Sequence, residues 1–311
     1  MLGLNTNVWL AFAAVYAVLA VCTVVLYFVR TRRPERDLTE LWQRTRSWWF
    51  MVTAIVVAIL LGAPGVIALF AFVSFLALRE YLSIVPSRKE DRLVVLLSYF
   101  VIPANYALIA TDHYGIFLIF VPIYVFVFFP FVMVCIGQVK RFLAFMGTLH
   151  WGHMTAVYNI SYVAFLMMLP AGRNPDGAGP GLVVFLLGLT SLNDVAQYAW
   201  GKLIGGPKIV PSVSPNKTWA GFLGGWATTV AASVLVAPFL TPFTLSTSLL
   251  VGAVIGLAGF AGDVTISAVK RDLEFKDTSD LIPGHGGILD RVDSLTFTAP
   301  LYFHLLYFFH F

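Results

Sequence analysis

Acidic and basic side chains gather between Asp263 and Asp293, in a sequence that is otherwise strongly apolar. This segment holds seven of the 16 acidic residues and four of the 20 basic residues. Ionisable groups close to a bilayer are costly unless they are paired, bound to a metal or hydrated. The segment 263–293 is therefore the first candidate for a functional site.

Asp263, Ser267 and Lys270 are spaced to lie on one face of a helix, because residues three and four positions apart stack along it. A carboxylate, a hydroxyl and an ammonium group on one face, at the end of a membrane helix, suit a phosphate bound through a metal ion. The structural alternative for Asp263 is an ion pair with Lys270 or Arg271.

Asp290 and Asp293 lie one helical turn apart at the start of the last apolar segment. Carboxylates are favoured at a helix N-terminus, so each of them has a structural alternative as a capping residue. Their convergence with Asp263 on one polar segment favours metal and phosphate chemistry over capping alone.

His285-Gly286-Gly287 lies in the loop before Asp290. The glycines allow the backbone to approach a ligand closely or to adopt a positive φ. For His285, binding of a leaving group, proton donation and fixing of the loop all remain open. Zinc is a poor fit, because this loop brings no cysteine or second histidine.

A second group of polar residues lies between 193 and 221. Asn193 and Asp194 interrupt an apolar span, and Ser214, Lys217 and Thr218 lie in the loop that follows it. Asn193 has an alternative role as a hydrogen-bonding contact between helices, whereas a carboxylate at position 194 indicates function. The Lys-Thr pair lacks the glycine spacing of a P-loop.

Composition indicates a polytopic membrane protein. Of 311 residues, 59% are hydrophobic and 12% are charged, and the mean hydropathy is +0.84. A soluble domain has roughly 25% charged residues. Cys22 and Cys135 lie in apolar runs, which argues against a disulfide framework. The net charge of +4 is explained better by membrane topology than by nucleic-acid binding.

Ten apolar segments are long enough to cross a bilayer as helices, and the predicted fold class is therefore all-α. They cover residues 8–29, 48–62, 64–84, 93–110, 115–136, 143–169, 181–203, 219–240, 247–269 and 293–310. The loops on one side of this path carry 19 of the 20 basic residues, and Arg173 lies opposite. The positive-inside rule places the basic side in the cytosol and both termini outside.

The segment from Ser267 to Asp293 resembles the signature of the phosphatidate cytidylyltransferases, also called CDP-diacylglycerol synthases. The pattern is Ser-x-apolar-Lys-Arg, four residues, Lys-Asp, then Pro-x-His-Gly-Gly and Asp-Arg-apolar-Asp, and every fixed position is met. The stretch from Ser214 to Gly221 is similar to a second segment of the family. It departs at Ala220, where the family usually has Glu or Gln, which puts a local contact of that side chain in doubt.

The resemblance implies an organisation of the chain. Residues 1–30 would be an additional N-terminal transmembrane anchor, 31–47 a cytosolic basic segment, and 48–311 a membrane-embedded cytidylyltransferase domain. The expected fold is a nine-helix family core plus one N-terminal helix. For 31–47, a basic loop and an amphipathic segment on anionic headgroups remain alternatives.

The resemblance also implies an activity, in which phosphatidate attacks CTP to give CDP-diacylglycerol and pyrophosphate. Mg²⁺ prefers oxygen ligands such as carboxylates, phosphates and water, and a second cation is left open. The expected catalytic residues are Asp263, Ser267, Lys270 and Asp290, and the expected metal ligands are Asp263, Asp290 and Asp293. The phosphates of CTP and phosphatidate are expected to meet Lys217, Ser214, Thr218, Arg271, Lys276, His285, Gly286, Gly287, Arg291, Asn193 and Asp194.

Other functions remain as alternatives. A CTP-dependent lipid kinase acting on polyprenols is close in class, but the 267–293 signature favours the synthase. A CDP-alcohol phosphotransferase lacks support because its Asp-Gly-x2-Ala-Arg element is absent. A transporter would have charges spread along several helices near the bilayer centre, and a catalytically altered paralogue finds its single hint in Ala220. We expect an integral membrane protein, in the cytoplasmic membrane if the source is bacterial, with its site facing the cytosol and no nucleic-acid partner; a homodimer is left open.

Overall fold

Within the residues that the structure describes, the secondary-structure elements are helices and there is no strand, which confirms the all-α prediction. The computed structural model describes residues 4–32, 35, 38–86, 88–137, 139–275, 278–279, 281 and 286–311. An isolated antiparallel bridge joins Lys208 to Thr218 in the loop between two long helices. The polar residues of interest therefore sit on helices or in the loops that join them.

The helices follow one another with short connections. They are α1 (Thr6–Arg32), α2 (Thr39–Leu60), α3 (Ala63–Ile84), α4 (Arg92–Ser98), α5 (Val101–Ala110), α6 (Tyr114–Ile119), α7 (Phe126–Cys135), α8 (Phe142–His153), α9 (Ile160–Phe165), α10 (Ala178–Ile204), α11 (Trp219–Leu240), α12 (Leu245–Asp272), α13 (Leu289–Val292) and α14 (Leu295–His310). Wider π-type turns, η2 (Phe120–Val125) and η3 (Met154–Asn159), continue α6 into α7 and α8 into α9.

Seven helical segments within the described residues are long and apolar enough to cross a membrane. They are Thr6–Arg32, Ala63–Ile84, Arg92–Ala110, Tyr114–Cys135, Ala178–Ile204, Trp219–Leu240 and Leu245–Asp272. The other three expected spans correspond to α2, to the run from α8 through α9, and to α13 with α14. The chain is thus a polytopic membrane protein, and the count of ten crossings stays a prediction.

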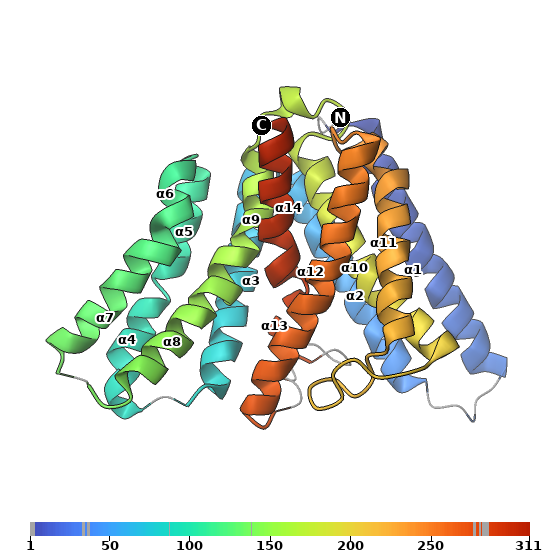
Figure 1. Cartoon of the computed structure of the whole chain (residues 1–311). Helices are drawn as coiled ribbons and strands as arrows, with labels where there is room; N and C mark the ends of the chain where they lie inside the picture. Colours follow the sequence, from blue (N-terminus) through green and yellow to red (C-terminus); the bar gives the residue numbers. More distant parts are fainter. Residues whose placement is uncertain are drawn as a thin grey trace.

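Both termini lie at the same end of the molecule in Figure 1, and the loop between α10 and α11 lies at the other end with the connection between α12 and α13. This arrangement agrees with an even number of crossings. We call the end that carries these two loops the basic end. The loop between α10 and α11 contains Lys208 and Lys217, and the connection to α13 follows Arg271 at the end of α12. The polar residues of interest lie at this end.

Four helices surround the polar residues. α10, α11, α12 and α14 pack against one another, and α13 contacts α3. The close approach of α11 to α10 depends on glycine, because a Cβ on Gly225 would lie 2.4 Å from Cγ of Gln197. Helix α1 lies against α2, where Tyr16 bonds Thr53 at 3.2 Å and Trp49 donates to Thr23 at 3.0 Å.

Two boundaries differ from the sequence prediction. Helix α2 begins at Thr39, so the second half of the basic segment 31–47 is already helical. An ion pair between Arg44 and Glu40, one turn apart, lies on this extension. The last apolar segment is preceded by α13, and the helix is interrupted by a turn at Asp293 and Ser294 before α14 begins.

Candidate active site

The two polar segments of the sequence meet through Lys217 and Asp263. The Nζ atom of Lys217, in the loop before α11, lies 2.5 Å from Oδ2 of Asp263 on α12. The same ammonium donates to Oε1 of Gln197 on α10 at 3.0 Å, and it lies 5.8 Å from the centre of the Phe260 ring. Both charged side chains are partly exposed, at 20% and 22%. The pair therefore lies at an accessible edge of the helix packing.

Asp263 also receives the Ser267 hydroxyl at 3.3 Å, one turn further along α12. This contact confirms that the residues four positions apart share a helical face. Ser267 is 8% exposed.

A second ion pair joins Lys270 to Asp290 deeper in the protein. Nζ of Lys270 lies 2.7 Å from Oδ1 of Asp290, and the two side chains are 10% and 3% exposed. Oδ2 of Asp290 accepts the amide and the hydroxyl of Thr278, both at 2.9 Å, and the amide of Gly287 at 3.0 Å. Burial alone would raise the pKa of Asp290, but these donors and Lys270 hold the pKa below its usual value. Asp290 is therefore a carboxylate held on both oxygens, by Lys270 on Oδ1 and by Thr278 and Gly287 on Oδ2.

Two further carboxylates, Asp194 and Asp293, lie near Asp263 of the Lys217 pair. The charges of Asp194 on α10 and Asp263 on α12 both act on Asp293, which follows α13. Ser294 joins two of them, donating its hydroxyl to Asp194 at 2.9 Å and its amide to Asp293 at 2.7 Å. Gly262 permits this approach, because a Cβ there would lie 2.5 Å from the Asp293 carbonyl oxygen.

Glu80, which the sequence analysis did not single out, lies near Asp290, and the Thr278 hydroxyl is within hydrogen-bond distance of both carboxylates. This residue of α3 is 5% exposed. Its Oε1 accepts from the Ser279 hydroxyl at 2.7 Å and the Ile288 amide at 3.0 Å. Its Oε2 accepts from the Leu289 amide at 2.8 Å. An acidic residue near the end of the apolar span 64–84 was the signal that could have identified it.

The other predicted residues fall into groups. Arg271 donates from Nε to the Val213 carbonyl at 3.2 Å, which ties the end of α12 to the loop before α11. Ser214 is half-buried in that loop, Arg291 is exposed, and Gly286 has the expected positive φ of 79°. Lys276 and His285 lie outside the described residues.

Thr218 and Asn193 have clear structural contacts. The Thr218 hydroxyl caps α11 by accepting the Gly221 amide at 3.1 Å. Asn193 is fully buried, accepts the Thr229 hydroxyl at 3.1 Å and donates to the Gly256 carbonyl at 3.4 Å. These bonds connect α10 to α11 and α12, so they support the interhelical alternative for Asn193.

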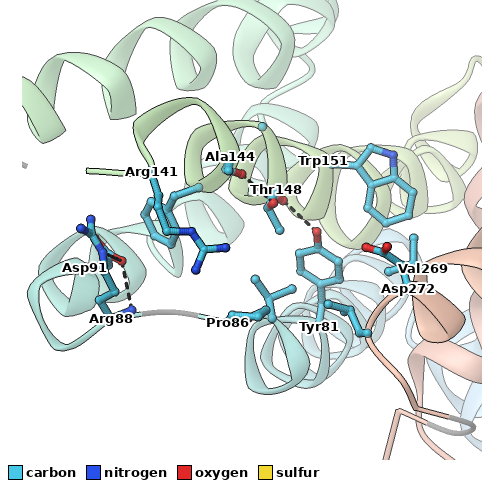
Figure 2. Close-up of a pocket in the computed structure, with 14 residues that line it drawn as sticks. Tyr81, Pro86, Arg88, Asp91, Arg141, Ala144, Thr148, Trp151, Val269 and Asp272 are labelled. Carbon is cyan, nitrogen blue, oxygen red and sulfur yellow. Dashed lines mark hydrogen bonds and ion pairs between the residues drawn. The ribbon is translucent and has the colours of Figure 1, made fainter. Parts of the chain in front are cut away.

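A cavity of about 530 Å³ opens beside this cluster, between α3, α8 and the last turns of α12 (Figure 2). Tyr81, Trp151 and Val269 line it, and none of the described site residues predicted from the sequence does. Tyr81 follows Glu80 on α3, and Val269 precedes Lys270 on α12. The ends of these two helices therefore separate the cavity from the polar cluster.

Across the described residues, no three histidine, cysteine, aspartate or glutamate side chains form a ready-made metal site. The arrangement does combine carboxylates, two lysines and hydroxyl groups at the basic end of membrane helices. Such a set can neutralise and orient phosphate groups without a protein nucleophile.

Comparisons with known proteins extend over most of the chain. The model of the cytidylyltransferase family matches residues 42–309. The uncharacterized protein YnbB of Escherichia coli K12 is 42% identical over 296 residues, which is 94% of this chain and 96% of that protein.

Two phosphatidate cytidylyltransferases match over a shorter stretch. The one from Brucella suis is 38% identical over 146 residues, 47% of this chain and 53% of that protein. The one from Synechocystis is 40% identical over 136 residues, 43% of this chain and 46% of that protein. The match thus spans about half the length of these two relatives.

Proposed function

The chain belongs to the cytidylyltransferase family, and on that premise we propose that it transfers the CMP moiety of CTP to phosphatidate. The products are CDP-diacylglycerol and pyrophosphate. The family makes the protein a nucleotidyltransferase, and the relatives from Brucella suis and Synechocystis carry the name of the proposed activity. Phosphatidate as the acceptor is the proposal.

The observation that carries the proposal is the contact of Lys217 with Asp263. Lys217 belongs to the Ser214–Gly221 stretch that resembles the family, and Asp263 lies one helical turn before the Ser267–Asp293 signature. Their contact places a cation and a carboxylate side by side at a partly exposed edge. Both substrates are anionic, so their mutual repulsion must be offset before they can approach. A lysine ammonium has three donors, and Lys217 uses two of them, on Asp263 and Gln197. Among the residues that the structure describes, the third donor has no partner, and we propose that it meets a phosphate oxygen.

In the proposed reaction a phosphate oxygen of phosphatidate attacks the α-phosphorus of CTP. A bond forms between that oxygen and the α-phosphorus, and the bond from the α-phosphorus to the bridging oxygen of the β-phosphate breaks. Pyrophosphate leaves with the electron pair. The attacking oxygen is already ionised, so catalysis consists of positioning and of stabilising the developing charge. Lys217, Lys270 and Arg271 would supply positive charge at this edge.

The donor set fits a magnesium ion in its chemistry. Asp194, Asp263 and Asp293 are close neighbours, yet the ammonium of Lys217 is bonded to Asp263 alone among them. We propose that Asp263 and Asp293 hold Mg²⁺, with substrate phosphates and water as the remaining ligands. The ion would polarise phosphate oxygens and offset their charge. Asp290, the third predicted ligand, is engaged by Lys270 and by Thr278 and Gly287. A metal ion at Asp290 would share Oδ1 with Lys270 or displace its ammonium group.

The proposed site faces the cytosol, because the basic loops at this end satisfy the positive-inside rule. In a bacterium the membrane would be the cytoplasmic membrane. CTP would then reach the site from the cytosol, and phosphatidate from the inner leaflet.

Radiolabelled CTP tests the proposal directly. Purified protein is incubated with phosphatidate, Mg²⁺ and CTP labelled at either the α- or the γ-phosphate. Cytidylyl transfer places the α-label in the lipid extract and the γ-label in pyrophosphate. A CTP-dependent lipid kinase would place the γ-label in the lipid instead. Absence of α-label from the lipid, with an active Brucella suis phosphatidate cytidylyltransferase assayed in parallel, would contradict the proposal.

A further inference from the structure

Glu80 connects the first half of the chain to the signature loop. It lies in the last two turns of α3, and its partners Thr278, Ser279, Ile288 and Leu289 lie about 200 residues later in the sequence. Both amides that it accepts belong to the start of α13. A carboxylate that accepts the free amides at a helix N-terminus fixes both the position and the direction of that helix.

The link from Glu80 to Asp290 passes through Thr278. The Thr278 hydroxyl lies 3.2 Å from Oε2 of Glu80 and 2.9 Å from Oδ2 of Asp290. A hydroxyl has one proton, so it donates to one of the two carboxylates at a time. Within the described residues the partners of Glu80 are uncharged donors, whereas Asp290 has the ammonium of Lys270. Glu80 therefore holds the loop, and the loop holds Asp290 against Lys270.

Gly287 lies so close to the Glu80 carboxylate that a side chain at position 287 would clash with it. A Cβ at this position would lie 2.4 Å from Oε2 of Glu80 and 2.1 Å from the Thr278 hydroxyl oxygen. Neither neighbour can retreat freely, because both are held by further hydrogen bonds. The second glycine of the His-Gly-Gly element is required here to leave room for Glu80.

We propose that Glu80 is a positioning residue of this enzyme, which holds Thr278, Ser279 and the start of α13 so that Asp290 meets Lys270, and that Gly287 makes room for its carboxylate. This inference rests on the proposed function only for its kinetic consequence. The positioning itself is a property of the fold.

The test compares Glu80→Gln, Gly287→Ala and the double variant with the wild type in detergent. The matched control is Glu90→Gln, which removes a carboxylate from an exposed position at the same end of the molecule. Glutamine keeps the length of the side chain but turns one acceptor into a donor, which faces an amide or a hydroxyl donor. We expect kcat to fall about 10- to 100-fold in both single variants, with a smaller effect on the KM for CTP, and no change in the control.

Hydrogen exchange provides a readout that does not depend on the reaction. We expect faster exchange of the amides of Thr278, Gly287, Ile288 and Leu289 in Glu80→Gln, with unchanged exchange in α10 and α11. The double variant is expected to lose less than the product of the single losses, because both changes act on one contact.

Three results would overturn the proposal. The first is unchanged exchange at the loop in Glu80→Gln. The second is a fall in melting temperature with kcat per folded molecule preserved, which would mean general stabilisation. The third is independent effects in the double variant. If the wild type fails to transfer CMP to phosphatidate, the proposed function fails, and the exchange result alone then decides the role of Glu80.

Discussion

Lys217 and Asp263 form an ion pair, with 2.5 Å between Nζ and Oδ2, although they lie 46 residues apart in the sequence. Lys217 is in the loop before α11, and Asp263 is in the C-terminal half of α12. The pair unites two segments that look independent in the sequence. It also leaves each partner partly exposed, at 20% and 22%. A charged pair that is neither fully buried nor fully solvated is available to exchange partners with an arriving phosphate or metal ion.

The Lys217→Gln variant tests whether this lysine binds substrate. We expect kcat/KM for CTP to fall by at least about tenfold, because a charge-assisted contact to phosphate is lost and Asp263 loses its cation. Steady-state kinetics at saturating phosphatidate measure the change. Lys208→Gln is the control, since Lys208 is exposed on the same loop. Equal behaviour of the two variants would mean that position 217 contributes only to the charge of the basic end.

Asp263→Asn tests the carboxylate of the same pair. One oriented electrostatic group in an active site is worth about 3 kcal/mol, which corresponds to a loss of more than about 100-fold in turnover. We expect this loss with near-normal expression, measured as CMP transfer over a range of Mg²⁺ concentrations. Asp272→Asn, an exposed carboxylate at the end of the same helix, is the control. Wild-type turnover of Asp263→Asn at low Mg²⁺ would rule out the metal role.

Cysteine labelling tests the orientation of the helices. Asn174 follows Arg173, the basic residue that lies opposite the basic end, and would be the first choice for labelling. However, Asn174 is 1% exposed and donates to the carbonyls of Ala178 and Leu240. Gly172 is exposed, and a Cβ there meets nothing within 4 Å. In a variant without Cys22 and Cys135, we expect an impermeant thiol reagent to label Gly172→Cys from outside and Ser212→Cys only from the cytosol. The reverse pattern would overturn the cytosolic location of the site.

The Arg88–Asp91 pair, which lines the cavity of Figure 2, provides a test of pH dependence. Burial alone would raise the pKa of Asp91, but hydrogen bonds from Arg88 and its charge hold the pKa below the usual value. A carboxylate with a lowered pKa contributes stability above its unfolded pKa of about 3.9, and that contribution is lost as the pH falls through the folded pKa.

We therefore expect the melting temperature of Asp91→Asn to lie below that of the wild type by a constant amount between about pH 5 and pH 8. The difference should shrink as the pH falls from about 4, near the unfolded pKa, through the lower pKa of folded Asp91. Thermal melts in detergent over this pH range measure it. A difference that grows as the pH falls has the wrong sign for this pair.

The sequence predicts those parts of the site that depend on local spacing. The Ser267 contact to Asp263 follows from helical periodicity. The two glycines leave close approach and a positive φ open, and the structure shows a positive φ at Gly286 and a close approach at Gly287. Helix α2 begins at Thr39, before the apolar span 48–62, and Arg44 and Glu40 form an ion pair one turn apart on this extension. Hydropathy marks where a span is apolar and does not mark where its helix begins.

The contacts between segments were not predictable in the same way. The meeting of Lys217 with Gln197 and Asp263 depends on how closely α11 approaches α10, which is set by small residues such as Gly225. The role of Glu80 was not predicted from the sequence, because its partners are two backbone amides and two hydroxyls. A sequence does not indicate which amides a carboxylate will contact.

The long separation in sequence between Glu80 and its partners also determines when these contacts can form during synthesis of the chain. The amide of Leu289 is 209 residues away, so at about 5–20 residues per second a ribosome adds it some 10–40 seconds after Glu80. During that interval the Glu80 carboxylate lacks the donors of Thr278, Ser279, Ile288 and Leu289, because these residues have not yet been synthesised. The contacts that hold Asp290 against Lys270 consequently assemble only after α13 has been made, and nascent chains that stop before α13 lack Asp290 itself.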